Sequence, residues 1–404
     1  ESKLSNYSIV GDERKNLIIQ KIQIEESLYT KIPNLKANIF EINDVKKVLP
    51  LNSVLIEFQK YQPIDLKRVL NKNSDRIKTL ERYGALILNS SGEINFVDLG
   101  LAKIIEKDIE NALYSTKQYL DDADDLWNKL GNLIFNPIID VIGDSDTLFI
   151  SPDSELNRVP FAALGVNNSN RYLGETYKLR LLTTGRELLS IEDDDKYQTN
   201  QSLVLANPLF DLKNNNKINN NKTNYSLVQK RSADFKYEKF ENLPGTEKEG
   251  KLISSLIDGK LLLNEKATVL AVQKIPSPKI VHIASHAKFI SDNKDKRNPL
   301  LRGMIILAGA NNPKSNILDD GILTALEITR LNWTGTDLVV VSACESGLGE
   351  ISSGEGIYGL KRAISVAGAK SSLLSLWKVN DLATAEFMES FYLKLKKGEG
   401  KAEA

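Results

Sequence analysis

The stretch Asp337-Leu-Val-Val-Val-Ser-Ala-Cys-Glu-Ser-Gly-Leu-Gly349 decides the fold, because a continuous apolar run is followed by a glycine-containing turn. A second apolar run, Lys279-Ile-Val-His-Ile-Ala-Ser-His286, lies roughly sixty residues earlier. Apolar runs without alternation are typical of strands that are buried on both faces of a parallel sheet. We therefore expect two parallel strands whose ends carry Cys344 and His286.

Around these two runs, apolar strands alternate with helical stretches, which predicts an α/β fold with a mostly parallel sheet flanked by helices. Strands are expected over 202–208, 260–263, 279–286, 337–344 and 371–377, and helices over 247–257, 267–272, 356–366 and 382–397. The Asn-rich segment 213–224 is expected to form a mobile loop, since it holds too little apolar surface to offset its ordering entropy.

The first part of the chain has a different pattern. Residues 1–119 are expected to form an α+β region of unknown role, and residues 120–404 a second domain with its core at 200–397. The expected elements before residue 200 are helical stretches over 1–48 and 103–132, a strand from 53, a hairpin over 83–99 and a strand from 147.

Composition excludes several classes of protein. The 404 residues hold 53 basic and 53 acidic side chains, so the chain lacks the basic surface typical of nucleic-acid binders. No apolar run approaches the roughly 18 residues of a membrane span, and the polar N-terminus does not resemble a secretory signal. The single cysteine excludes an intrachain disulfide and fits a reducing, cytoplasmic location. Because the chain begins at Glu1 without a methionine, we expect it to be a piece of a longer polypeptide.

His286 and Cys344 both lie where parallel strands end, and sites in open α/β sheets collect beyond those ends. A cysteine thiolate becomes a nucleophile when an imidazolium or a helix N-terminus lowers its pKa. The backbone N–H groups of Ala287 and Cys344 are candidate donors to an oxyanion. The alternative is that Cys344 is an inert, buried, small hydrophobic residue, as many free cysteines are.

Other motifs in the chain do not indicate a metal or a cofactor. His282 and His286 would stand about 13 Å apart on a strand, so they form no metal site, and His282 is expected in the core. The glycine-rich stretch Gly347-Leu-Gly-Glu-Ile-Ser-Ser-Gly-Glu-Gly356 lacks the spacing of a phosphate-binding loop, and its acidic residues would repel a phosphate. Asp320 and Glu327 are expected to have structural roles at a turn and a helix start.

Several ordered motifs resemble the CHAT domain, closely over residues 120–404 and more loosely before them. They are Val281-His-Ile-Ala-Ser-His-Ala287, Asp319-Asp-Gly-Ile-Leu-Thr-Ala325, Asp337-Leu-Val-Val-Val-Ser-Ala-Cys-Glu-Ser-Gly347, Gly354-Glu-Gly356, Ala367-Gly-Ala369, Ser375-Leu-Trp-Lys-Val-Asn-Asp381, Ile150-Ser-Pro-Asp-Ser-Glu-Leu-Asn-Arg-Val-Pro-Phe-Ala-Ala-Leu164 and Leu243-Pro-Gly-Thr-Glu-Lys-Glu-Gly250. CHAT proteins are caspase-like cysteine peptidases related to separase, common in bacteria and often preceded by tetratricopeptide repeats. The resemblance implies a caspase–haemoglobinase fold with His286 and Cys344 as the catalytic dyad. In that fold the two side chains need not hydrogen-bond directly, and the histidine can polarise the scissile carbonyl or protonate the leaving amine instead of taking the thiol proton. The family usually has glycine where this chain has Ala287, which keeps the N–H but resists a positive φ.

The resemblance also implies a substrate pocket. Asp381 matches the aspartate of a similar stretch in separase, which lines the pocket for the residue before the cut, and a carboxylate there favours Arg over Lys. The strand Ser375-Leu-Trp377 could pair with an extended substrate, with Trp377 as a wall. The alternatives are that Asp381 only caps the helix that follows it, and that Trp377 is a core residue.

Together these features predict a cytoplasmic cysteine endopeptidase that cleaves after Arg or Lys and needs no metal or organic cofactor. The family context suggests regulated proteolysis, for example in bacterial defence or cell death. Its expected partners are a protein or peptide substrate and a regulatory protein or preceding repeat domain, without nucleic acid or membrane. The alternative is a catalytically silent interaction module with the same fold. Nucleotide binding is a third, disfavoured interpretation because of the acidic glycine loop.

Overall fold

The computed structural model describes residues 19–20, 23, 40–64, 79–166, 171–189, 197–212, 239–289, 300, 303–312, 319–342, 350–352, 356–375 and 381–404. The chain divides into two compact units, Glu1–Lys47 and Val48–Ala404. The expected loop 213–224 and most of the helical pattern expected over 1–48 lie outside the described residues, apart from the helix α2 (Ile42–Val48). Within the described part of the chain, no helix has both the length and the apolar character needed to cross a bilayer.

The second unit begins with a mixed five-stranded sheet in the order β3-β2-β1-β4-β5. Its strands are β1 (Ser53–Tyr61), β2 (Arg82–Asn89), β3 (Ile94–Leu101), β4 (Thr147–Ser151) and β5 (Lys178–Leu181). Strands β2 and β3 confirm the expected hairpin, and β1 pairs antiparallel with β2 but parallel with β4. The sheet therefore joins strands that lie on both sides of residue 119 in the sequence.

Two helices, α4 (Ala102–Lys117) and α5 (Ala123–Ile134), cover one face of this sheet. In α4 the buried residues Ala102, Ile105, Ile109 and Leu113 recur at helical spacing and form the stripe that packs on the sheet. Burying each large apolar side chain contributes roughly 1.5–3 kcal/mol, which fixes the helix on this face. Shorter helical segments follow, namely η2 (Asn136–Ile138), α6 (Ile139–Ile142), η3 (Ser154–Arg158), η4 (Phe161–Ala163) and α7 (Leu173–Thr176).

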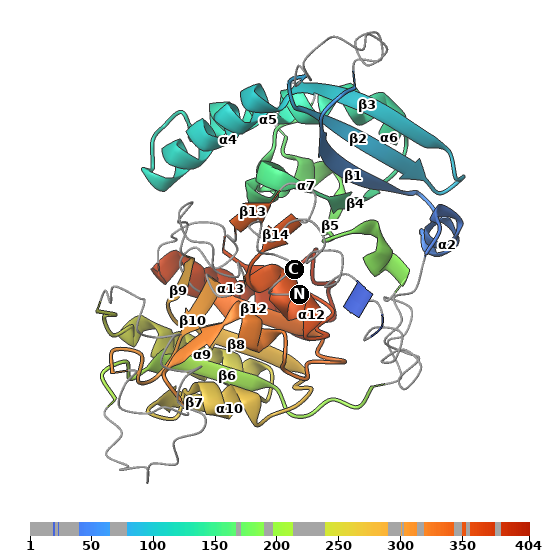
Figure 1. The fold of residues 1–404 in the computed structure, drawn as a ribbon. Helices are drawn as coiled ribbons and strands as arrows, with labels where there is room; N and C mark the ends of the chain where they lie inside the picture. Colours follow the sequence, from blue (N-terminus) through green and yellow to red (C-terminus); the bar gives the residue numbers. More distant parts are fainter. Residues whose placement is uncertain are drawn as a thin grey trace. The chain divides into compact units, whose positions relative to one another are not determined.

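A second five-stranded sheet has the order β15-β12-β8-β6-β7, and every described pairing in it is parallel. Its strands are β6 (Leu203–Pro208), β7 (Lys260–Asn264), β8 (Ile280–Ala284), β12 (Leu338–Ser342) and β15 (Ser372–Leu374). Figure 1 shows β8 between β6 and β12. The parallel sheet flanked by helices, predicted from the apolar runs, is confirmed.

Helices cover both faces of the parallel sheet. On one face lie α9 (Pro244–Leu256) and α13 (Asp381–Lys396), and on the other lie α10 (Val269–Gln273), α11 (Ala325–Ile328) and α12 (Leu360–Val366). Side chains alternate along a strand, so Val281 and Ile283 of β8 pack into the core under α10 and α12. His282, between them, faces α9 and α13 instead.

Two parts of this region differ from the expectation. The helix expected over 356–366 begins only at Leu360, because Gly356–Tyr358 forms the strand β14, which pairs with β13 (Glu350–Ser352). The connection between His286 and β12 also contains a small antiparallel sheet that was not predicted. Its strands are β9 (Ala287–Phe289), β10 (Gly303–Ile306) and β11 (Ile322–Thr324). Strands of three or four residues are too short to give a periodic signal in the sequence.

Candidate active site

The register between β8 and β12 defines the candidate site. The last paired residues of the two strands are Ala284 and Ser342, and the N–H of Ser285 donates to the carbonyl of Ser342 at 3.3 Å. His286 follows Ala284 by two positions, and Cys344 follows Ser342 by two positions. The two predicted residues therefore hold equivalent positions in the sequence, past the carboxyl ends of neighbouring parallel strands. Cys344 itself lies outside the described residues.

The imidazole of His286 is held by a backbone carbonyl. Its Nε2 atom lies 2.9 Å from the carbonyl oxygen of Glu241, just before α9. A carbonyl can only accept a hydrogen bond, so we assign the donated proton to Nε2. In the neutral ring this tautomer leaves the lone pair on Nδ1, which is the nitrogen that can accept a proton.

Two phenylalanine rings flank the same imidazole. The ring centroid of Phe210 lies 5.3 Å from that of His286, and the centroid of Phe240 lies 5.8 Å from it. Phe210 is fully buried, and its centroid is 6.2 Å from that of Phe240. The two rings restrict the rotation of the imidazole, which is itself only partly exposed. Sequence reasoning missed Phe210, Phe240 and Glu241, because the chain brings them to His286 only through the fold.

Ala287 opens β9, directly after the histidine. It pairs with Ile305 of β10, while the N–H of Ile306 donates to the carbonyl of His286 at 2.8 Å. Hydrogen-bonded and non-hydrogen-bonded pairs alternate in an antiparallel ladder. Because His286 and Ile306 are a hydrogen-bonded pair, the next pair, Ala287 and Ile305, is a non-hydrogen-bonded pair. The N–H of Ala287 therefore points away from β10. The φ angle of Ala287 is not positive, so alanine meets no backbone strain at this position.

The predicted substrate-pocket residues are only partly described. Ser375 directly follows β15 and is partly buried, and Asp381 is the first residue of α13. Trp377 and the side chain of Asp381 lie outside the described residues. The pocket and capping roles of Asp381 both remain predictions.

His282 is fully buried, which confirms its expected place in the core. Its Nδ1 atom lies 3.1 Å from the hydroxyl of Tyr392 on α13, and its Nε2 atom lies 3.1 Å from Oε1 of Glu249 on α9. Burial raises the pKa of Tyr392, and the negative charge of Glu249 raises it further. One imidazole therefore joins β8 to both helices on that face of the sheet.

Asp320 and Glu327, which were expected to have structural roles, both accept hydrogen bonds from nearby backbone N–H groups. The side chain of Glu327 accepts from the N–H of Thr324 at 3.0 Å, and the Thr324 hydroxyl accepts from the N–H of Glu327 at 3.2 Å, which caps α11. Oδ1 of Asp320 accepts from the N–H of Ile322 at 3.0 Å. Among the residues that the structure describes, no three His, Cys, Asp or Glu side chains gather as metal ligands would.

Residues 124–404 match the family model of the CHAT domain. The chain is also similar to the human protein named "Tetratricopeptide repeat protein 28", with 24% identity over 289 residues, which is 64% of this chain and 11% of the human protein. The mouse protein of the same name is 24% identical over 287 residues, again 64% of this chain and 11% of the relative. The chain thus spans only a small part of the length of these relatives. Because the family match covers more than half of the chain and includes the whole parallel sheet, the protein belongs to the CHAT-domain family of caspase-like, cysteine-peptidase-related domains.

Proposed function

We propose that the protein is a cysteine endopeptidase that hydrolyses peptide bonds with Cys344 as nucleophile and His286 as its partner. The observation that carries this proposal is the pairing of Ala284 with Ser342 in adjacent parallel strands. Neighbouring strands lie about 4.8 Å apart, and the two residues that follow each strand end can span at most about 7 Å of chain. A thiol and an imidazole so tethered can reach the same peptide carbonyl.

The tautomer of His286 sets the proposed proton transfers. With its Nε2 proton bonded to Glu241, the ring uses Nδ1 to carry the proton of the Cys344 thiol and to give it to the leaving amine. The sulfur bonds to the carbonyl carbon, the C–N bond breaks, and the amine departs with that proton. Water then hydrolyses the thioester, which restores the thiol and releases the acid.

The negative charge on the tetrahedral intermediate needs hydrogen-bond donors. The N–H of Ala287 supports this role, because the ladder register directs it away from β10. The N–H of Cys344 is the second proposed donor. In other enzymes the loss of one such donor lowers kcat by roughly 10²–10³.

For the substrate we propose a protein with Arg or Lys before the cut, bound by Asp381. Strand β15 stands at the end of the strand order among the described strands, which suits pairing with an extended peptide along Ser375 and Trp377. The names of the two mammalian relatives refer to tetratricopeptide repeats, which supports control by a repeat domain or regulatory protein. We place this activity in regulated proteolysis, such as bacterial defence or cell death, in a reducing compartment such as the cytoplasm.

Turnover of short fluorogenic peptides tests this proposal. Wild-type protein should release the fluorophore from peptides that end in Arg, and Cys344→Ala should abolish release. His286→Ala should lower the rate by at least about 10², the lower range for a catalytic acid or base. Absence of turnover by the wild-type protein across Arg, Lys and acidic peptides, even with candidate activators present, would favour the silent interaction module.

A further inference from the structure

We infer that Asn311 is a positioning residue for His286, which it orients through the backbone segment of Phe240 and Glu241. This inference rests on the proposed function, because it assigns a supporting role in the same site. Asn311 follows β10 by five positions and lies 25 positions after His286 in the sequence.

The side-chain amide of Asn311 clamps Phe240. Its Oδ1 atom accepts from the N–H of Phe240 at 2.9 Å, and its Nδ2 atom donates to the carbonyl of Phe240 at 2.9 Å. The backbone N–H of Asn311 also donates to the carbonyl of Phe210 at 3.0 Å. One residue thus holds the backbone of both phenylalanines whose rings flank His286.

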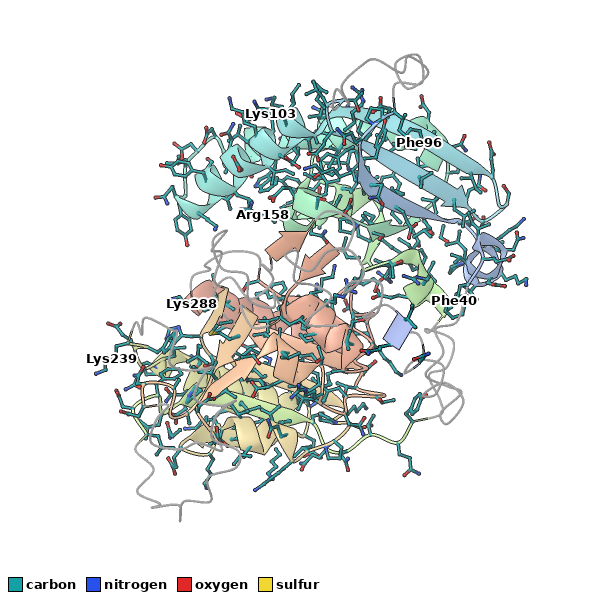
Figure 2. The ribbon with its side chains drawn as sticks, in the orientation of Figure 1. Phe40, Phe96, Lys103, Arg158, Lys239 and Lys288 are labelled. Carbon is teal, nitrogen blue, oxygen red and sulfur yellow. The ribbon has the colours of Figure 1, made fainter. Side chains whose placement is uncertain are left out.

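The orientation of the Asn311 side-chain amide is set by a second hydrogen bond that its nitrogen donates. Nδ2 of Asn311 also donates to Oδ1 of Asp211 at 3.2 Å, so the amide nitrogen must face this carboxylate and the amide oxygen must face the N–H of Phe240. The carboxylate of Asp211 in turn lies 3.7 Å from Nζ of Lys239, which is labelled in Figure 2 at the start of the segment.

This clamp acts on the histidine through the next residue in the chain. The segment 239–243 has no helix or strand of its own, so its position depends on bonds such as those to Asn311. Glu241 follows Phe240 directly and presents the carbonyl that accepts from Nε2 of His286. If the clamp is lost, this carbonyl and the ring of Phe240 both move relative to the imidazole, and the preference for the Nε2–H tautomer weakens.

Asn311→Ala tests the inference, and Asn312→Ala is a matched control that removes the same type of side chain at the next position. The chain contains only two histidines, so nitrogen-detected NMR of the imidazoles gives two sets of signals. In alkaline buffer we expect Asn311→Ala to shift His286 from the Nε2–H tautomer towards a mixture, with the His282 signals unchanged. The control should leave both sets unchanged.

The same variants give a kinetic readout. A displaced imidazole should lower kcat about 10- to 100-fold with KM changed less than about 3-fold, since misplacement of a catalytic group by about 1 Å costs on this order. An unchanged His286 tautomer and unchanged kcat in Asn311→Ala would overturn the inference. If the wild type cleaves no peptide but the tautomer still shifts, the positioning role stands and the proposed function fails.

The His282 signals also report whether the variants fold. If Asn311→Ala disturbs them, the isosteric Asn311→Asp replaces it, because it keeps the acceptor for the N–H of Phe240 but loses the donor to the carbonyl of Phe240. The inference requires Asn311→Asp to shift the His286 tautomer in the same direction. A folded Asn311→Asp with the wild-type tautomer would overturn it.

Discussion

Nε2 of His282 lies 3.1 Å from Oε1 of Glu249, and both side chains are buried between the parallel sheet and the helices α9 and α13. Strand β8, which contains His282, leads directly to His286, and α13 begins at Asp381. This buried contact therefore stabilises both β8, which leads to His286 of the proposed dyad, and α13, which begins at Asp381 of the proposed pocket.

Removal of one partner of this pair should destabilise the protein strongly. In His282→Ala the carboxylate of Glu249 stays buried without its partner, and we expect the free energy of unfolding to fall by about 3 kcal/mol or more. Urea denaturation measures the change, with the exposed neighbour Lys248→Ala as the control on the same helix. A loss smaller than about 1 kcal/mol in His282→Ala would show that the pair does not hold the helices.

Two buried tyrosines predict a loss of stability at alkaline pH. Burial raises the pKa of Tyr392 and of Tyr83, with smaller contributions from the charges of Glu249 and Glu106 respectively. Since the pKa is near 10 in the unfolded chain and higher in the fold, the stabilisation is complete below pH 10 and is lost as the pH rises above it. Each tyrosine should lower the free energy of unfolding by about 1.4 kcal/mol per pH unit in that range.

Urea denaturation at several pH values between about 9 and 11 tests this predicted loss of stability, because it measures the slope of the free energy of unfolding against pH. Tyr392→Phe should reduce this slope by the contribution of one proton. The control Tyr114→Phe, at an exposed position, should leave the slope unchanged. An equal slope in Tyr392→Phe and the wild type would mean that this hydroxyl ionises in the folded protein.

Gly321 is required by the close approach of two backbone segments. Its φ is +76°, and an added Cβ would collide with the backbone nitrogen of Ala310 and lie 2.8 Å from the carbonyl oxygen of Ala308. We expect Gly321→Ala to cost about 2 kcal/mol or more in thermal or urea denaturation, because the strain and the backbone clash add. Gly245→Ala in the first turn of α9 is the control, since its Cβ meets open space, and it should stabilise by less than about 1 kcal/mol.

Asp381 should determine the preference for basic residues. A carboxylate pairs with a guanidinium through two hydrogen bonds, so we expect Asp381→Ala to lose the preference for Arg while retaining cleavage of other peptides. Profiling of a peptide library measures this, with Glu386→Ala, further along α13, as the control. An unchanged preference for Arg in Asp381→Ala would mean that Asp381 does not bind the substrate and only caps the helix.

Much of the fold was predictable, because the apolar runs of β8 and β12 are typical of strands that are buried on both faces of a parallel sheet. The spacing of Ala284 from His286 and of Ser342 from Cys344 also follows from the sequence once the strands are paired. The surroundings of the imidazole were not predictable. Glu241 contributes only a backbone carbonyl, and Asn311 acts through a contact with Phe240 that spans 71 positions. No residue type or spacing identifies such contacts.

Glu249, the partner of His282, could not be predicted from the sequence for a related reason. Glu249 lies in a motif that resembles one of the CHAT domain, but of its sequence neighbours Glu247 is partly exposed and Lys251 is exposed. Only the register of α9 on the sheet selects Glu249 as the buried acid. The short strands β9, β10 and β11 escaped prediction because three or four residues are too few to give a periodic signal in the sequence.

The most direct test of the proposed dyad uses the single cysteine of the chain. A peptidyl ketone inhibitor that carries Arg and alkylates thiols should form one adduct, mapped to Cys344 by mass spectrometry. The rate of its formation should fall by about 10² or more in His286→Ala, because the thiolate then lacks its imidazole partner. If the native protein forms no adduct while the unfolded chain does, or if His286→Ala reacts as fast as the wild type, the account of a Cys344–His286 peptidase is contradicted.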